Sequence, residues 1–259
     1  MKLTIEVAIY VLLALHSTCN VFAQAPRKAV ETTAVKPTAA EPTVDQILER
    51  HIEAVGGKAA LEKISSRVTK GTFEVTGQGL KGEIEIYAKA PNKLLTIQNI
   101  TGLGLIQDGY DGKTAWSQNP MTGLREKSGA ELAMILRAAD FYATLNTKRN
   151  YSKLEMKGKE KVGGRETWVV LAMPAEGAPV KMYYDAQTGL LAKTDAEFES
   201  PEGKFPVESI VEDYREVDGV KLPFTLRQGS AVASAVLKLA EVKSNVPIED
   251  AKFTKPAAK

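Results

Sequence analysis

The chain has 259 residues, of which 44% are hydrophobic and 25% are charged. This composition is typical of one large globular domain and excludes collagen-like and wholly disordered classes. The formal net charge is +2, and the lysines and arginines are interspersed with acidic residues. Such a distribution lacks the basic patch that nucleic-acid binding requires, so no nucleic-acid partner is expected.

Residues 1–23 have the pattern of a signal peptide. Lys2 and Glu6 are their only charged side chains, and residues 7–15 are almost entirely apolar. Small residues lead to Ala23, after which cleavage is expected. The apolar stretch is too short and too interrupted for a transmembrane helix, so the pattern predicts export to the periplasm.

The only cysteine, Cys19, lies inside this segment, so no disulfide is expected after cleavage. An alternative is that Cys19 becomes a lipid-anchored N-terminus that tethers the protein to a membrane. The preceding residues 16–18 fit a lipoprotein processing site poorly, which favours export without an anchor.

Residues 24–42 are rich in Ala, Pro, Thr, Lys and Glu and contain almost no large apolar side chain. They cannot bury enough surface to fold and are interpreted as a disordered linker. One domain is therefore expected over 43–259. It should begin with a helix capped by Thr43 and Gln46 and ended by Gly56 and Gly57. The apolar residues of this helix share one face and are Val44, Ile47, Leu48, Ile52 and Val55.

Beyond residue 65 the apolar residues recur with a period of two, which is typical of half-buried strands. Ile84 and Ile86, for example, alternate with charged neighbours. Turn signals such as Asp111-Gly112 and Gly163-Gly164 separate these segments. The pattern predicts about ten to eleven strands in a mainly β fold, an antiparallel meander curled into a barrel or a deep half-barrel.

One segment interrupts the strands. Ser128 and Glu131 form a capping-box pattern, which predicts a helix over 130–145. Two apolar stripes run along this segment, so more of its surface is apolar than a single packing face requires. The helix is either buried inside the curved sheet or a lid over an apolar cavity, and the sequence leaves both interpretations open.

Recognisable catalytic groups are not apparent. The glycine pattern at 77–82 matches a dinucleotide-binding fingerprint, but the residues after it alternate as a strand, so a hairpin connection is favoured. His51 is the only histidine outside residues 1–23, and a lone helical histidine is usually structural. Asp108 and Asp111 lie beside glycines, a position typical of turn residues rather than of a carboxylate pair or calcium ligands. No cofactor, metal site or enzymatic activity is expected.

Apolar and aromatic side chains, in contrast, are abundant. The segment 167–173, which contains Trp168 and Val170, is apolar on both faces and must be covered twice. If the interior of the curled sheet is incompletely filled, an apolar pocket suited to hydrocarbon results. If side chains fill it, the domain has a solid core and no pocket.

Several motifs resemble a known family. Residues 87–93 contain Lys89-Ala90-Pro91-Asn92, residues 108–116 read Asp-Gly-Tyr-Asp-Gly-Lys-Thr-Ala-Trp, and Asn119-Pro120 follows. This order resembles the periplasmic outer-membrane lipoprotein carriers of the LolA/LolB fold, with a Lys-x-Pro-Asn segment before a strand and an Asp-Gly-Lys-Thr-x-Trp hairpin leading to Asn-Pro. Stretches at 184–190, 213–223 and 245–253 also fit, so the resemblance covers about 65–256.

The resemblance implies an incompletely closed β barrel with an N-terminal helix and a helical lid, whose apolar cavity receives the acyl chains of lipoproteins without a cofactor. The chain departs from the family at Ala90, where the carriers have an arginine that helps to hold the lid closed. The neighbouring Lys89 is expected to point to the opposite face of its strand.

Three functions are weighed. The first is a periplasmic carrier or binding protein for lipid acyl chains or lipoproteins, served by a membrane-bound donor or acceptor. The second is a non-transporting envelope scaffold or sensor with a filled interior, and the third, least supported, is an envelope hydrolase. For the first, alternation assigns a set of side chains to the cavity and lid. They are Ile84, Ile86, Leu95, Ile97, Trp116, Met121, Leu132, Ile135, Leu136, Phe141, Trp168 and Val170.

Overall fold

The computed structural model of the chain describes residues 41–257 except 78, 201–202 and 231–232. The expected signal peptide (1–23), Cys19 and all but the last two residues of the expected linker (24–42) lie outside the described residues. In the part that is described, no helix is long and apolar enough to cross a membrane.

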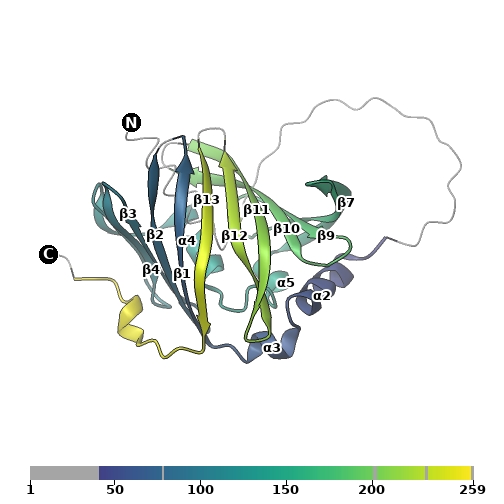
Figure 1. The fold of residues 1–259 in the computed structure, drawn as a ribbon, viewed down its shortest axis with the longest axis horizontal. Helices are drawn as coiled ribbons and strands as arrows, with labels where there is room; N and C mark the ends of the chain where they lie inside the picture. Colours follow the sequence, from purple (N-terminus) through teal and green to yellow (C-terminus); the bar gives the residue numbers. More distant parts are fainter. Residues whose placement is uncertain (1–40, 78, 201–202, 231–232, 258–259) are drawn as a thin grey trace, which may run out of the picture.

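Thirteen antiparallel strands form one curled sheet (Figure 1). Their bounds are β1 Ser66–Thr76, β2 Leu80–Lys89, β3 Lys93–Ile100, β4 Gly104–Tyr110, β5 Ala115–Asn119, β6 Gly123–Glu126, β7 Lys153–Val162, β8 Arg165–Met173, β9 Val180–Asp185, β10 Leu191–Ser200, β11 Gly203–Val217, β12 Val220–Ser230 and β13 Ser234–Ser244. The count exceeds the expected one because strands as short as β6, with four residues, carry too little alternation to be recognised.

The strand order is β6-β5-β4-β3-β2-β1-β13-β12-β11-β10-β9-β8-β7. The chain runs outward from β1 to the edge at β6, crosses to the other edge at β7, and returns strand by strand until β13 pairs with β1. Since β6 and β7 do not pair, the barrel is open. An antiparallel, incompletely closed barrel with helices, as the sequence predicted, is confirmed.

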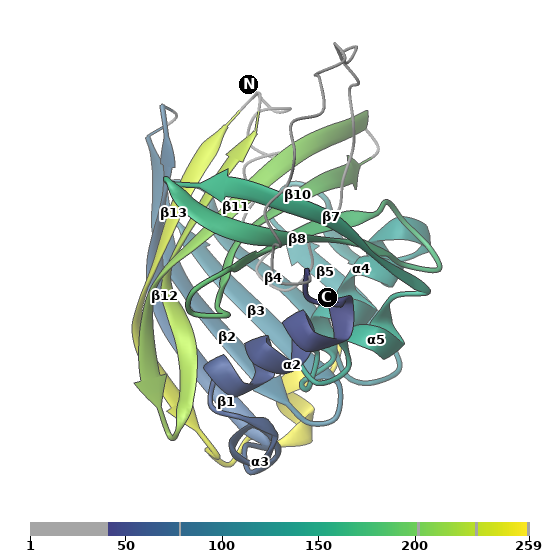
Figure 2. The same cartoon turned by 90° about the vertical axis from the view of Figure 1, so that its right-hand side faces the viewer.

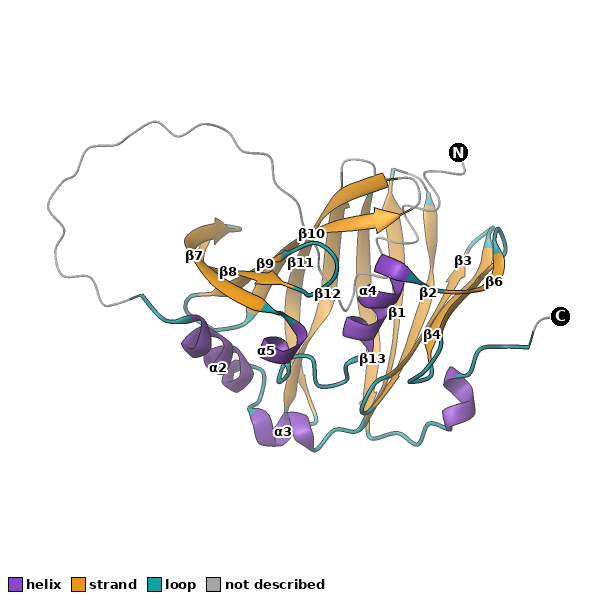
Figure 3. Ribbon diagram, turned by 180° about the vertical axis from the view of Figure 1, so that it is seen from behind, coloured by secondary structure: helices purple, strands orange, loops and turns teal. Residues whose placement is uncertain are grey.

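Helices occupy the concave side of the sheet (Figures 2 and 3). They are α2 Val44–Ala54, α3 Lys58–Glu62, α4 Gly129–Ala139 and α5 Thr147–Asn150, and a 3-10 turn, η1 Asp250–Phe253, lies near the C-terminus. The expected capping box of α2 is confirmed, because the Gln46 amide N–H donates to the Thr43 Oγ1 (3.2 Å) and the Thr43 N–H donates to the Gln46 side chain (2.9 Å). Gly56, at φ +124°, follows the end of this helix, and a side chain at this position would collide with the Gly219 carbonyl oxygen.

The largest apolar cluster joins α4 to the concave face. Ile135 and Ala139 of α4 pack with Ile84 and Ile86 of β2 and with Leu237 of β13. A second cluster packs α2 on the strands of the β7 edge through Ile47, Leu48 and Val170. Helix α4 therefore fills the concavity over β1–β4 and reaches parts of β10–β13, in agreement with the interpretation of a buried helix for that part.

The helix expected over 130–145 is shorter than predicted. It ends at Ala139, because Asp140 leaves the helical conformation and its carboxylate accepts hydrogen bonds from the Tyr142 N–H and from the Asn146 and Asn150 side chains. Ser128 is the N-cap residue of α4 as predicted, but the capping box does not form, since the Ser128 side chain makes no capping bond and Glu131 instead pairs with Arg125 at 2.6 Å.

Candidate ligand cavity

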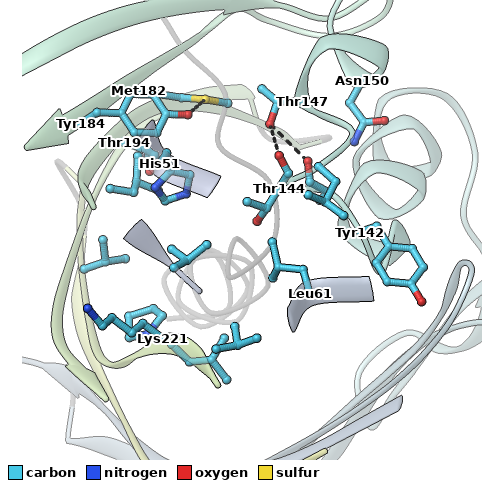
Figure 4. A pocket seen from close by; sticks show the side chains of 18 of the residues that line it. His51, Leu61, Tyr142, Thr144, Thr147, Asn150, Met182, Tyr184, Thr194 and Lys221 are labelled. Atoms are coloured by element: carbon cyan, nitrogen blue, oxygen red, sulfur yellow. Dashed lines mark hydrogen bonds between the residues drawn. The ribbon is translucent and has the colours of Figure 1, made fainter. Parts of the chain in front are cut away.

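A cavity of about 330 Å³ lies on the concave side beside α4, over strands β9–β12 (Figure 4). Its floor is made by side chains of these strands, among them Met182, Thr194, Val211 and Leu226. Its walls come from α2, α3 and the first residues of β1, and its roof is the closing segment, residues 140–151 between α4 and β7. This volume lies at the small end of the ~300–1,000 Å³ range of ligand pockets.

The lining is mainly apolar and aromatic. Phe141 and Leu145 of the closing segment line the cavity, together with Val55, Leu61 and Leu191. Two tyrosine hydroxyls of the lining already donate hydrogen bonds within the protein, Tyr214 to the Leu191 carbonyl (2.9 Å) and Tyr184 to the Met182 sulfur (3.2 Å). Burial raises the pKa of both phenols, so they stay neutral. The arrangement can hold hydrocarbon and offers no activated nucleophile.

The closing segment is tied to three neighbouring elements. Tyr142 donates to the Ile64 carbonyl after α3 (3.1 Å), and the Phe141 N–H donates to the Pro91 carbonyl between β2 and β3 (3.0 Å). Lys148 pairs with Asp45 of α2 at 2.6 Å through two exposed side chains. Because exposed ion pairs and single hydrogen bonds contribute only about 0.5–1.5 kcal/mol each, each of these three contacts holds the roof weakly.

Charge is unevenly distributed around the cavity. Arg67 of β1, Arg137 of α4 and Lys221 of β12 belong to its lining, and none of the described lining residues is Asp or Glu. Arg137 donates to the Glu176 carbonyl at 3.0 Å, whereas Arg67 lies over the Phe141 ring with its guanidinium carbon 5.6 Å from the ring centroid. The electrostatic character of the lining is therefore positive.

His51 reaches the cavity from α2. Its Nδ1 lies 3.0 Å from the Gly189 carbonyl oxygen, which can only accept, so Nδ1 carries the proton. The ring lies 5.0 Å from the Tyr184 ring, centroid to centroid. Burial lowers the pKa of His51 to about 4, partly opposed by the Gly189 hydrogen bond, so the imidazole is neutral at neutral pH.

This lowered pKa predicts a loss of stability in mild acid. In the unfolded chain the histidine pKa is near 6.5, so as pH falls the unfolded chain binds this proton before the folded protein does. The stabilisation that the neutral His51 gives the folded state is therefore complete above pH ~6.5 and is lost as pH falls toward 4. The free energy of unfolding falls by about 3 kcal/mol over this range. Urea unfolding of wild type and His51→Gln between pH 7.5 and 4 should show that the variant is less sensitive to acid in this window. Since His51 is the only histidine outside residues 1–23, NMR titration reads it directly, and a folded-state pKa near 6.5 would contradict the prediction.

The structure places the expected cavity residues in several different environments. Ile84, Ile86 and Ile135 are buried in the cluster around α4, with Met121 and Leu132 at its border, while Leu136 is exposed. Trp168 and Val170 pack against α2. Phe141 alone of the expected set lines the cavity.

The inward assignment of Leu95, Ile97 and Trp116 is wrong. These side chains lie on the convex face of the sheet, where they pack with Ile248 and Phe253 of the C-terminal segment. Their strands are apolar on both faces, and alternation alone does not say which face is inside. The C-terminal segment provides the second cover.

The expectation for Lys89 is confirmed, because its ammonium lies on the convex face and binds Asp250 (2.7 Å) and the Ile248 carbonyl (2.8 Å). The two aspartates singled out from the sequence serve the fold. Asp111 accepts from the Lys113 and Thr114 N–H groups in a turn, and Asp108 is buried against Lys127 at 2.6 Å. No group of three or more potential metal ligands occurs among residues 41–257 as described.

Sequence reasoning missed most of the cavity lining. The floor residues Val211 and Leu226 alternate as strand residues should, but no local signal distinguishes a side chain that faces a cavity from one that faces a filled core. Arg67 carried a usable signal, since a charged side chain on the apolar-facing side of a strand is unusual.

The chain matches no family model and no curated protein. Solved structures with the same architecture exist. A LolA superfamily protein from Nitrosomonas europaea is 15% identical, with a TM-score of 0.57 over 83% of this chain and 99% of that one. A DUF1329 family protein from Desulfovibrio piger is 12% identical, with a TM-score of 0.57 over 82% and 97% of the two chains.

A third structure, an outer membrane lipoprotein-sorting protein domain from Vibrio parahaemolyticus, is 15% identical, with a TM-score of 0.55 over 80% of this chain and 96% of that one. At these identities the likeness concerns the fold. The class that fold and cavity define is a LolA-like open barrel with a pocket on its concave side, and the resemblance seen in the motifs at 87–93 and 108–116 is confirmed at the level of fold.

Proposed function

We propose that the protein is a periplasmic carrier or binding protein for lipid acyl chains or lipoproteins. The cargo chain lies in the cavity over β9–β12, beneath the closing segment. No covalent step is involved, and cargo arrives from and leaves to a membrane-bound donor or acceptor. The expected signal peptide supports the compartment.

The observation that carries the proposal is the incomplete filling of the concavity. Helix α4 fills it over β1–β4, but a mainly apolar space of about 330 Å³ is left over β9–β12. Each methylene moved from water into such a space contributes about 0.8 kcal/mol, so a single acyl chain gains ample affinity. A scaffold or sensor with a filled interior has no use for this space, and a hydrolase would need a nucleophile and base that the lining does not offer.

The weak attachment of the roof supports exchange of cargo. Displacing the closing segment breaks the Tyr142 and Phe141 hydrogen bonds and the exposed Lys148–Asp45 pair, while the sheet is left intact. A bound acyl chain covers the apolar floor and so stabilises the closed position of the closing segment. The segment therefore opens less readily when cargo is bound than when the cavity is empty. The fold likeness to a protein described as lipoprotein-sorting is consistent with such a role.

A cavity-filling variant tests the proposal. Val211 of β11 lines the cavity, whereas its neighbour Ile210 points to the other face of the sheet. Val211→Trp should lower the affinity for a fluorescent fatty acid at least about tenfold, because the indole occupies the space of the acyl chain. Ile210→Trp is the matched control and should bind like wild type.

Native mass spectrometry of the protein isolated from its own envelope, before and after delipidation, provides the second readout. An acyl species bound to wild type and Ile210→Trp but absent from a folded Val211→Trp supports the proposal. Equal lipid binding by wild type and both variants would show that the lipid binds outside this cavity. A wild type that is isolated without lipid and binds no fatty acid would favour the scaffold function.

A further inference from the structure

We propose that the cavity selects an amphiphile with an anionic head group, a carboxylate or a phosphate, and that Arg67 binds this oxyanion while the acyl tail lies over β9–β12. The inference rests on the proposed function and narrows it from acyl chains in general to one chemical class. The observation behind it is a cationic side chain that lines the cavity and has no hydrogen-bond or ion-pair partner among the described residues.

Arg67 belongs to the concave face by strand register. It lies opposite Ala88 of β2, and the residues of β1 on the same face include Phe73 and Val75, which are core residues. The Arg67 side chain lines the cavity next to the closing segment. The ring of Phe141, which belongs to this segment, has its centroid 5.6 Å from the guanidinium carbon. An anion bound here would sit at the junction of β1 and the roof.

The Arg67 side chain is half-buried, and no hydrogen bond or ion pair with the described residues compensates its charge. Its Nε is buried and has no hydrogen-bond partner, and burial alone lowers the pKa of Arg67. Taking a charge out of water is costly unless an opposite charge or several hydrogen bonds replace the hydration. The Phe141 ring contributes a cation–π contact but accepts none of the guanidinium hydrogens in the plane where they are donated.

The Nε of Arg137 is also buried without a partner, but every other arginine in the described part of the chain, Arg137 included, forms at least one hydrogen bond or ion pair, whereas Arg67 forms none. Five of them contact carboxylates, and two donate to backbone carbonyls. The carboxylate-bound arginines are Arg125, Arg149, Arg165, Arg215 and Arg227, and the carbonyl-bound ones are Arg50 and Arg137. A guanidinium that forms no hydrogen bond or ion pair with the described residues is available to a ligand, and its planar fork fits carboxylate and phosphate oxygens.

The rest of the lining supports the same sign of charge. Arg137 and Lys221 add positive charge, and among the described lining residues no carboxylate opposes it. A neutral or cationic head group would leave Arg67 unpaired in the closed complex. An anionic head group forms an ion pair with Arg67, which stabilises the closed, loaded state and has no counterpart in the empty protein.

Three twelve-carbon ligands separate head group from tail: dodecanoate, monododecyl phosphate and dodecanol, measured by calorimetry at pH 7.5. Wild type is expected to bind the two anions roughly 10- to 100-fold more tightly than the alcohol, the range of a charge-assisted hydrogen bond. Comparing the two anions tells carboxylate from phosphate. Acetate and inorganic phosphate, which lack the tail, should not bind measurably.

Arg67→Met keeps the length of the side chain and removes its charge. It should abolish the preference for anions while leaving dodecanol affinity within about twofold, and the melting temperature of the empty protein should stay level or rise by ~2–4 °C, because an uncompensated charge is gone. Arg227→Met, which removes an exposed arginine bound to Glu212 on β11, is the control and should keep the preference.

The outcomes are distinct. Equal affinity of wild type for dodecanol and dodecanoate overturns the inference but not the proposed function, and it does so even if Arg67→Met fails to fold. Loss of dodecanol binding together with a lower melting temperature would make Arg67 a structural residue. Failure of all three ligands to bind wild type would count against the proposed function itself.

Discussion

Trp116→Ala is expected to lower the free energy of unfolding by about 3–5 kcal/mol, the range for removing a buried tryptophan. Trp116 on β5 is 1% exposed and packs on the convex face with Leu95 and Phe253. Its indole Nε1 donates to the Phe253 carbonyl at 3.0 Å. The ring packs directly on Gly109 of the neighbouring strand, where any side chain would collide with it. The substitution removes this contact area and frees the C-terminal segment from the sheet.

Urea unfolding followed by circular dichroism measures the effect. Trp116→Phe is the matched control, since it keeps an aromatic ring and loses the hydrogen bond, and it should cost clearly less than the alanine variant. Proteolysis near residues 250–253 should accelerate in Trp116→Ala alone. Acyl-chain binding of the folded fraction should persist, because the cavity lies on the other face. Loss of binding in a folded Trp116→Ala protein would contradict this placement.

Lys127→Met is expected to destabilise the protein by a comparable amount, about 3–5 kcal/mol, because it leaves a buried carboxylate without its partner. The Lys127 ammonium lies 2.6 Å from Asp108, and each side chain is 2% exposed. Thr96, Gln98 and Ser117, all buried on neighbouring strands, place this pair in a polar patch of the otherwise apolar concave side.

A double-mutant cycle separates the pair from its parts. Asp108→Leu combined with Lys127→Met removes both charges, and the double variant should lie within about 1 kcal/mol of wild type or above it, since a buried ion pair is often no more stable than apolar side chains of similar size. Both single variants should be far less stable. A double variant as unstable as Lys127→Met alone would show that packing, rather than the unpaired charge, causes the loss.

Together these predictions distinguish the two faces of the sheet. The convex side of β3–β5 is a structural layer closed by the C-terminal segment, and the concave side under α4 is a second packed layer. The space over β9–β12 is a part of the interior that neither layer fills. Variants in the packed layers should change stability, and variants at Val211 or Arg67 should change ligand binding.

Local patterns in the sequence determined much of the architecture. The period of two beyond residue 65 and the turn signals predicted an antiparallel, curled sheet, and the Thr43-x-x-Gln46 pattern with Gly56 and Gly57 correctly bounded the first helix. These features depend on residues close together in the chain, where the alternation of strand faces, the capping bonds and the freedom of glycine act directly.

Only the tertiary structure decided which apolar face was inside and where space remained. Leu95, Ile97 and Trp116 turned outward because a segment 130 or more residues further along covers them, and the helix after Ser128 ended early because Asp140 binds groups up to residue 150. Whether Arg67 and His51 meet solvent, a partner or a cavity depends on α2, the closing segment and strands β9–β12 arriving at one place. Periodicity describes how a segment presents its side chains, while burial and cavities arise from the meeting of segments distant in the chain, so no local pattern contains them.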